Sequence, residues 1–349
     1  MAPPSFPARR LLPLLLLALG MAAHAQYVPV LQPALGPAQL AIVINDDEPN
    51  SVAVGEIYRK ARAIPARNVV HVRIPGKPHK LDVAQFRHLK ETIDAQLGPA
   101  IQAVLMVWTA PYAVECNGLT GAYTFGYDAE LCQDSCGAAK PSPYFNNPSR
   151  RPFTEFGMRL SMQLPTDSVD EARALIERGL SSAQALQPAS AYYLSTSQAA
   201  RNSRAPFFPP PGRIMARKLA LKRIQSDVLE GADDIMIYQT GMARVAKLET
   251  LKFRPGALAD HLTSFGGDLL GEGQMSSLRW LEAGATASYG TATEPCNHWQ
   301  KFPQPSVLLR HYLQGVTALE AYWRSVAWPA QGVFIGEPLA APYQRSVGR

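Results

Sequence analysis

The chain of 349 residues is long enough to bury a sizeable core, as one large domain or two ordinary ones. Its composition, 47% hydrophobic and 18% charged, is that of a folded globular protein and excludes wholesale disorder. The net charge of +6 is mild, and no dense run of lysine and arginine indicates nucleic-acid binding. No internal repeat or heptad pattern is present, which excludes a solenoid or a coiled coil.

The first 25 residues have the pattern of a secretory signal peptide. Arg9 and Arg10 form the positive region, residues 11–21 form the apolar region, and Ala23-His24-Ala25 fits the small-x-small rule of signal peptidase. The apolar run is shorter than the roughly 20 residues that span a bilayer, which favours cleavage over a membrane anchor. We expect an exported protein, periplasmic or secreted, that begins at Gln26 and keeps no membrane span after cleavage.

Short apolar runs alternate with stretches of helical periodicity along the chain. Strands are predicted over 39–45, 68–74, 101–108, 190–196, 233–238, 258–264, 285–289 and 332–335. Helices are predicted over 49–64, 82–97, 169–186, 213–229, 275–283, 305–313 and 317–326. Near-continuous apolar strands separated by helices indicate a sheet covered on both faces. The predicted fold class is therefore α/β, with a parallel or mostly parallel, doubly wound sheet.

Residues 109–166 interrupt this alternation. The segment is rich in proline, glycine, asparagine and aromatic residues, and it holds three of the four cysteines. A connection of that length is commonly functional or separately stabilised. We expect residues 26–349 to form a single α/β domain, with 109–166 as a loop-rich, disulfide-clasped excursion within it.

The four cysteines form an even set in a chain predicted to enter an oxidising compartment, which favours two disulfides. The spacing leaves three pairings open. We favour a local link between Cys132 and Cys136, which leaves Cys116 to pair with Cys296. Paired C-x-x-C elements are absent from the sequence, which argues against a zinc site.

Cys296 is also the strongest nucleophile candidate, because it follows a predicted strand and would lie at the carboxyl edge of the sheet, where α/β proteins bind ligands. Its candidate bases are His261 and His298, with His311 as a third histidine that can approach in three dimensions. The competing interpretation places Cys296 in a disulfide, and the even number of cysteines favours it. Glu294, in the same turn, is a ligand-binding candidate.

Acidic residues Asp46, Asp47 and Glu48 follow the first predicted strand and precede a helix. Such hard oxygen ligands can bind Ca²⁺ or Mg²⁺, or act as acid and base. Capping of the helix N-terminus explains the same residues without a ligand, and we favour it. Asp260 and His261 resemble an orienting carboxylate with its base, but neighbours in a strand point to opposite faces, so we expect a satisfied core histidine.

Other patterns exclude particular chemistries. No Gly-x-Ser-x-Gly elbow surrounds Ser264 or Ser288, which disfavours a serine hydrolase of that type. The glycines at 266, 267, 271 and 273 lack the dinucleotide fingerprint and its context. We therefore expect no cofactor and no resident metal. Thr240 and Ser264, whose hydroxyls lie near predicted strand ends, are ligand-binding candidates.

Three stretches of sequence, residues 45–56, 284–297 and 332–339, resemble an uncharacterised family of exported bacterial proteins. The end of the chain is also similar, more distantly, to gingipain-type cysteine peptidases, which have a caspase-like α/β fold. In those proteins a helix leads into a Gly-Ala-hydrophobic strand, here within 278–290, and a later strand ends in Gly-Asp-Pro, here Gly336-Glu337-Pro338. The resemblance implies a caspase-like fold for this chain.

In those peptidases the catalytic His precedes a Gly at the end of one strand, and the nucleophilic Cys ends the next strand. The matching positions here hold Thr240 before Gly241, and Ser264-Phe265 before two glycines. Because Cys–His catalysis needs a thiolate beside an imidazole, the resemblance implies the fold without the catalytic pair. We expect a pseudopeptidase that binds a small molecule, a peptide or a protein at the carboxyl edge of its sheet.

Two other interpretations stay open. One is an active hydrolase that uses Cys296 or the carboxylates of Asp46 and Asp47, and the other is a purely structural envelope protein. Because strands of repeated βα units point the same way, we expect the residues that end the strands to lie along one edge of the sheet. These residues are Asp46, Trp108, Gln239, Ser264 and Gly290.

Overall fold

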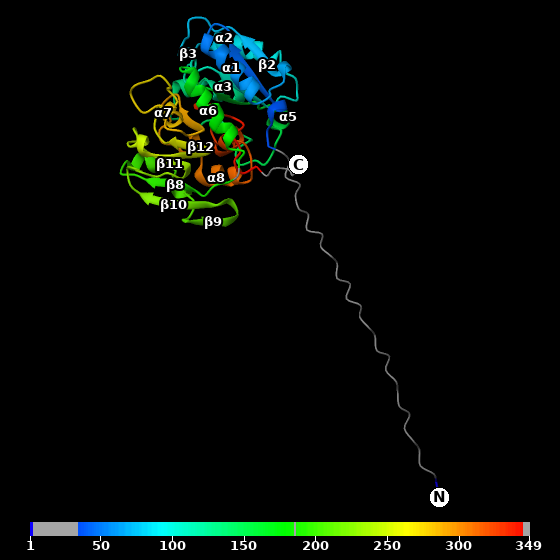
Figure 1. Cartoon of the computed structure of the whole chain (residues 1–349), viewed down its shortest axis with the longest axis vertical. Helices are drawn as coiled ribbons and strands as arrows, with labels where there is room; N and C mark the ends of the chain where they lie inside the picture. The colour runs from blue at the N-terminus through cyan, green and yellow to red at the C-terminus, as the bar shows by residue number, and fades with distance from the viewer. Residues whose placement is uncertain (3–33, 185, 345–349) are drawn as a thin grey trace. The chain divides into compact units, whose positions relative to one another are not determined.

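An eleven-stranded sheet organises the structure. The computed structural model describes residues 1–2, 34–184 and 186–344, so the predicted leader, apart from its first two residues, lies outside it. The strand order is β2-β1-β4-β7-β14-β13-β12-β11-β8-β10-β9, and Figure 1 shows β2 and β9 toward opposite ends of the fold. Among the described residues, no helix is both long enough and apolar enough to cross a membrane.

The elements follow the alternation that the sequence predicts, with additions in the excursion. The strands of the large sheet are β1 (Leu40–Asn45), β2 (Val69–Val72), β4 (Ala103–Val107), β7 (Leu160–Gln163), β8 (Ala189–Ser195), β9 (Gly212–Ile214), β10 (Leu219–Gln225), β11 (Ile235–Thr240), β12 (Phe253–His261), β13 (Ala287–Thr291) and β14 (Gly332–Gly336). A small sheet contains β3 (Lys80–Leu81), β5 (Ala113–Val114) and β6 (Asn117–Gly118). The α-helices are α1 (Pro49–Ala61), α2 (Val83–Asp94), α3 (Leu119–Phe125), α4 (Glu130–Gln133), α5 (Pro152–Phe156), α6 (Val169–Ser181), α7 (Leu278–Glu282), α8 (Pro305–Leu313) and α9 (Ala318–Ser325).

The direction of the strands reverses between β13 and β14. β14 pairs parallel with β7 on one side and antiparallel with β13 on the other. The remaining pairs of the eleven-stranded sheet are parallel, except that the edge strand β9 runs antiparallel to β10. The sheet therefore consists of two parallel halves that point in opposite directions. The predicted fold class, α/β with a mostly parallel sheet, is confirmed.

This reversal shows that the expectation of a single carboxyl edge is wrong. Asp46 and Trp108 follow β1 and β4 at one edge, whereas Gln239, Ser264 and Gly290 lie in or after β11, β12 and β13 at the opposite edge. The physical cause is β14, which returns along the preceding strand and pairs antiparallel with it. The order of strands and helices along a sequence does not reveal which strand turns back in this way.

Two further predictions differ from the structure. Residues 213–229, predicted as a basic helix, contain the end of β9 and all of β10, which pairs along its whole length with β8. This ladder, with Lys222 lying over the Tyr192 ring at 4.5 Å from its centroid, overrides the helix propensity of the local sequence. The excursion 109–166 contains β7, a buried strand that lies between β4 and β14 in the main sheet.

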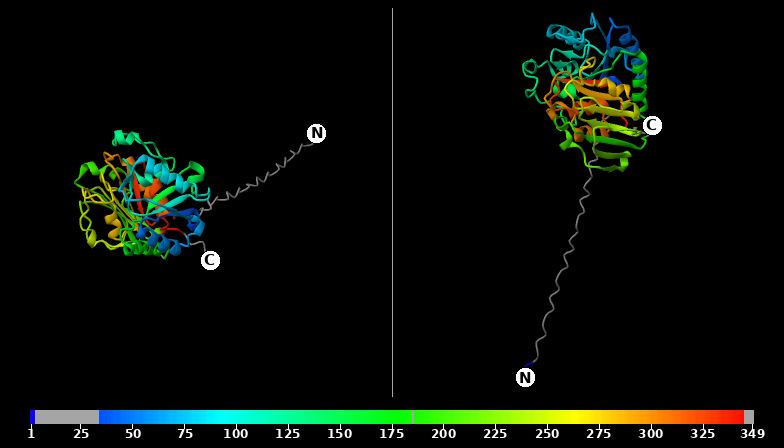
Figure 2. Two further views of the ribbon diagram at one scale, coloured as in Figure 1. Left: turned by 90° about the horizontal axis from the view of Figure 1, so that it is seen from above. Right: turned by 90° about the vertical axis from the view of Figure 1, so that its left-hand side faces the viewer.

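Helices cover both faces of the sheet, as the apolar strands predict (Figure 2). In β1, Leu40 and Ile42 pack into one core with residues of α1, α6, α8 and α9, whereas Ala41 and Val43 pack into a second core with α2 and α3. This alternation is the two-residue period of a strand. A third core surrounds Trp280 of α7. The strands are thus buried on both sides, which explains their near-continuous apolar sequence.

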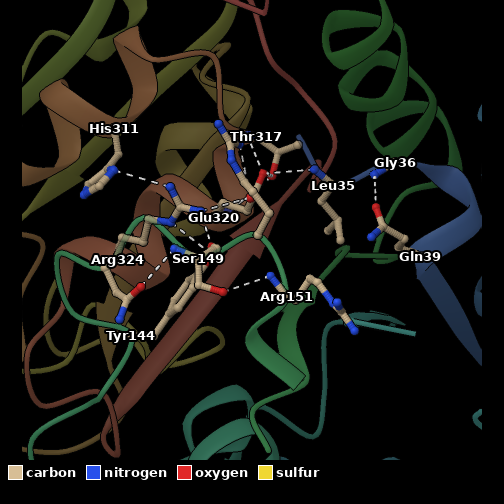
Figure 3. Close-up of polar contacts among 12 residues, drawn as sticks. Leu35, Gly36, Gln39, Tyr144, Ser149, Arg151, His311, Thr317, Glu320 and Arg324 are labelled. Carbon is tan, nitrogen blue, oxygen red and sulfur yellow. Dashed lines mark hydrogen bonds and ion pairs between the residues drawn. The ribbon is translucent and has the colours of Figure 1, made fainter. Parts of the chain in front are cut away.

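Glu320 of α9 lies buried at the centre of an ionic network (Figure 3). Its carboxylate accepts the Leu35 N–H at 3.2 Å and pairs with Arg324 at 3.2 Å and Arg150 at 3.4 Å. Arg324 also donates to the Ser149 carbonyl at 2.6 Å. Because a buried carboxylate without partners is costly, these contacts hold α9 against the loop that carries Ser149 and the segment that leads into β1.

His311 of α8 joins this network as a neutral ring. Its Nδ1 accepts from Arg324 Nη1 at 3.3 Å, and its Nε2 donates to Asn146 Oδ1 at 3.1 Å. Burial, assisted by the charge of Arg324, lowers the pKa of His311 to about 4. The folded protein therefore resists protonation of a ring that the unfolded chain protonates readily.

We predict that His311 makes the free energy of unfolding fall as pH drops from about 6.5 to about 4. In that window the unfolded chain binds the proton and the folded protein does not; above it both rings are neutral, and below it both are charged. The expected loss is about 1–3 kcal/mol. Denaturant titrations should show a weaker pH dependence in His311→Gln and an unchanged one in His88→Gln, whose ring is exposed. A wild-type pH dependence in His311→Gln would contradict the prediction.

Candidate functional site

The carboxyl ends of β11, β12 and β13 bring together most of the residues that the sequence proposes as a site. Thr240 is the last residue of β11 and lies opposite His261 in the parallel register of β11 and β12. Ser264 follows β12 by three residues, and Glu294 and Cys296 follow β13. Asp46 and Asp47 follow β1 at the opposite edge, so they cannot act together with this group.

Two close backbone contacts position the loop after β12. The Gly267 N–H donates to the Thr291 carbonyl at 2.9 Å, and the Ser277 N–H donates to the Gly266 carbonyl at 2.8 Å. A Cβ on Gly290 would lie 2.2 Å from the Gly266 carbonyl carbon, so only glycine allows the loop to rest directly on β13. The glycines in this segment thus serve close packing.

Thr240 and Ser264 hold hydroxyls where the resemblance places His and Cys. Thr240 is buried, and its Oγ1 has no hydrogen-bond partner among the described residues. The backbone of Ser264 is engaged on both sides: its N–H donates to Gln274 Oε1 at 2.8 Å, and its carbonyl accepts from Thr291 Oγ1 at 3.0 Å. The structure gives neither hydroxyl a histidine partner within the described residues.

His261 is a satisfied core residue, as the sequence predicts. Its Nε2 donates to the Met275 carbonyl at 3.0 Å, and its Nδ1 accepts from Trp280 Nε1 at 2.9 Å. Burial lowers its pKa to about 3, so the ring is neutral. Asp260 points to the other face of β12, where it pairs with Arg204. His261 therefore has no free nitrogen to offer a nucleophile at this edge.

The disulfide pairing favoured from the sequence is wrong. Cys116 pairs with Cys132, and Cys136 pairs with Cys296. The first pairing follows from Asn117, whose side chain donates to the Asp128 carbonyl at 2.8 Å and accepts the Asp128 N–H at 3.0 Å. These two bonds bring the segment that enters α4 back to β6, which places Cys132 beside Cys116.

The second disulfide joins the excursion to the turn after β13. Lys301 Nζ donates to the Ser135 carbonyl at 2.6 Å and so holds the neighbouring Cys136 near Cys296. In the same turn, the Glu294 carboxylate accepts the Cys296 N–H at 2.7 Å, and the His298 ring packs on Trp328 with centroids 5.7 Å apart. All four cysteines are cross-linked, so the structure contains no free thiol.

The acidic residues after β1 each have a separate partner. Asp46 bonds His71 Nδ1 at 2.7 Å, Asp47 pairs with Arg73 at 3.0 Å, and Glu48 accepts from Thr166 Oγ1 at 2.6 Å. None of them caps α1 through a side-chain hydrogen bond, so the capping interpretation is wrong in its detail. Among the described residues, no three His, Cys, Asp or Glu side chains gather closely enough to hold a metal ion.

A shallow cleft of about 460 Å³ lies between the loop after β11 and the loop after β12, and its lining includes Gln274, the hydrogen-bond partner of the Ser264 N–H. The lining also includes Arg244 and Leu270. Leu270 is 39% exposed, and Phe265 on the same loop is 37% exposed. No sequence motif singles out Gln274 or Arg244, because the loops that carry them have no periodic pattern. The cleft offers apolar contacts and side chains of both charges, because Arg244, Lys247 and Arg279 line it together with Glu249, Glu272 and Glu282.

Comparison with known proteins shows a relation of fold. No protein-family model and no curated protein matches the sequence. Among solved structures, one described as a protease aligns with a TM-score of 0.50 at 9% identity, over 88% of this chain and 79% of that chain. The crystal structure of the arginine-specific cysteine proteinase gingipain R gives 0.49 at 8% identity, over 89% and 80%. A complex of the pro- and mature domains of that proteinase from Porphyromonas gingivalis gives 0.42 at 7% identity, over 87% and 80%.

The chain is therefore distantly similar in structure to a protease, as the resemblance at its carboxyl-terminal end implies. At 9% identity the likeness is one of fold alone. It assigns neither a family nor an activity, and the chemistry of the site follows from the residues of this chain.

We predict that the Cys136–Cys296 disulfide stabilises the protein more than Cys116–Cys132 does. It joins residues 160 positions apart, whereas the other disulfide joins residues 16 apart. The larger loop removes more conformational entropy from the unfolded chain. The difference in free energy of unfolding is about 2 kcal/mol on the loop-entropy relation. Denaturant titration of the two paired Cys→Ser variants measures it, and peptide mapping without reduction checks the pairings. Equal losses in the two variants would contradict the prediction.

Proposed function

We propose that this protein is an exported, non-catalytic relative of gingipain-type peptidases, which binds a ligand at the carboxyl edge of β11, β12 and β13. The observation that carries the proposal is the state of the groups that peptidase chemistry would need. All four cysteines are cross-linked, and His261 uses both ring nitrogens within the core. Thiolate–imidazole catalysis requires the two groups free and within hydrogen-bond distance.

The same edge has features that suit binding. The cleft is open, Leu270 and Arg244 line it, and Phe265, on the same loop as Leu270, exposes further apolar surface. Apolar contacts with a few fixed polar groups are the usual composition of a site for a peptide or small molecule. Two disulfides support a protein that works in an oxidising compartment, which agrees with the predicted leader.

A hydrolase that uses Cys296 would first need its disulfide to Cys136 reduced. We predict that the mature protein, residues 26–349, cleaves no member of a broad peptide library, with or without a reductant. Mass spectrometry of the digests measures cleavage, and Cys296→Ala is the matched variant. Cleavage by the wild-type protein that disappears in Cys296→Ala, with the fold retained, would contradict the proposal and identify Cys296 as a nucleophile.

We predict that Phe265 contributes to ligand binding. The library is passed over the immobilised mature protein, and retained peptides are identified by mass spectrometry. Phe265→Ser should reduce retention about tenfold, because it removes apolar contact area from the site. The control is Val52→Ser on α1, which replaces another exposed apolar side chain, 41% exposed, away from this edge. Equal retention by the two variants would place binding elsewhere, and no retention by the wild-type protein would contradict the proposed function.

A further inference from the structure

Three hydrogen-bond donors at the carboxyl end of β12 converge on a single oxygen atom. The backbone N–H groups of Ser264 and Phe265 donate to Gln274 Oε1 at 2.8 and 3.2 Å, and the Thr263 hydroxyl donates to the same atom. An amide oxygen has two lone pairs, so three donors exceed its usual capacity. A carboxylate oxygen, which is charged, forms stronger bonds with such a set.

Two guanidinium groups contact the donor set and the segment that carries Gln274, and their charges offset the carboxylates of Glu249, Glu272 and Glu282 in the cleft lining. Arg201 Nε donates to the Thr263 hydroxyl at 3.5 Å, so its charge lies beside one of the three donors. Arg244 donates to the carbonyls of Glu272 and Gly273, next to Gln274 in the chain. Both arginines thus donate to neutral oxygens, and the Gln274 amide that accepts from the three donors is also neutral.

The side chain of Gln274 is half-buried and lines the cleft. The neighbouring backbone is fixed on one side, where the Met275 N–H donates to the Ala243 carbonyl at 2.9 Å. On the other side Gly273 is exposed, and a Cβ added there would meet no atom within 4 Å. A rotation about the side-chain bonds of Gln274 would carry its amide into the cleft that it already lines.

We propose that Thr263, Ser264 and Phe265 form a carboxylate-binding site, which the amide of Gln274 occupies when no ligand is bound. The ligand is a molecule with a free carboxylate, whose oxygen replaces Gln274 Oε1 on the three donors. Its apolar part lies along the cleft against Leu270. This inference rests on the proposed function, because it concerns the same edge of the sheet. It names the chemistry of the ligand and the residue, Gln274, that occupies the site without a ligand.

The first test uses acetate as the simplest carboxylate, on the mature protein. Gln274→Ala empties the donor set, so sodium acetate should raise its melting temperature by about 2 °C relative to sodium chloride of equal ionic strength. Gln274→Glu supplies a carboxylate from the chain itself, and should melt above the wild type and gain nothing from acetate. The control Gln225→Ala, an exposed glutamine on β10, should behave as the wild type. No acetate effect on Gln274→Ala, or a Gln274→Glu variant that melts below Gln274→Ala, would overturn the proposal.

The second test distinguishes the source of the carboxylate. Three peptides of the sequence Gly-Ala-Leu-Phe, labelled at the N-terminus with dansyl, which has no carboxyl group, are compared by anisotropy: the free acid, the C-terminal amide, and the amide with Glu in place of Ala. The site is supported if an acidic peptide binds Gln274→Ala at least tenfold tighter than it binds Gln274→Glu. Tight binding of the free acid identifies a terminal carboxylate, and tight binding of the Glu peptide identifies a side-chain carboxylate. Binding of the amide as tight as that of both acids would overturn it.

Failure of this inference is distinguishable from failure of the proposed function. If Phe265→Ser loses peptide retention but the Gln274 variants bind acid and amide alike, the edge binds ligands and the carboxylate site is wrong. Thr263→Val provides a further check, because it removes one donor and leaves the loop backbone in place. It should weaken binding of the free acid to the Gln274→Ala background several-fold, and unchanged binding would overturn the role of the hydroxyl.

Discussion

The structure depends on the insertion of β14 between β7 and β13. This strand is buried along its length and connects two parallel half-sheets that would otherwise each have an open edge. Phe334 at its centre stacks on Trp323 at 4.2 Å between centroids and meets Tyr289 edge-on at 4.8 Å. A Cβ on Gly118 would lie 2.1 Å from the Gly332 carbonyl oxygen, so the excursion approaches β14 at backbone distance. Both faces of the strand are thereby closed.

The end of β14 is fixed by a buried carboxylate. Glu337 accepts from the Tyr58 hydroxyl at 2.7 Å and from Arg62 Nε at 2.9 Å, both from the region of α1. Gly179 of α6 provides the space, because a Cβ there would lie 2.4 Å from Glu337 Oε2. The absence of a side chain at Gly179 thus leaves room for the buried Glu337 carboxylate.

Local patterns predict most of this fold, and long-range pairing accounts for what they miss. The 3.6-residue period of α1 and α6 and the apolar runs of β1 and β4 identify those elements, because burial on two faces leaves a direct trace in the sequence. The sequence does not predict β7, because a four-residue strand that contains Ser161 and Gln163 has no continuous apolar run. The sequence predicts a helix at β10, because its lysine and arginine favour helix locally. The hydrogen-bonded ladder with β8 makes this segment a strand instead. At the candidate site, Thr240 and Ser264 are found from strand ends, but Gln274 is recognised only by the atoms it contacts.

The disulfide between Cys136 and Cys296 makes the protein tolerant of a cut in its chain. A proteolytic nick beside the exposed Lys247 would separate β11 from β12 in the sequence, yet the two fragments would remain one covalent molecule. Neither fragment would hold a complete half-sheet, since β12 pairs with β11 and β14 pairs with β7 across the cut. The nicked protein would therefore persist as two interleaved chains, held by both the strand ladders and the bridge. A single proteolytic cut in this loop need not unfold the protein.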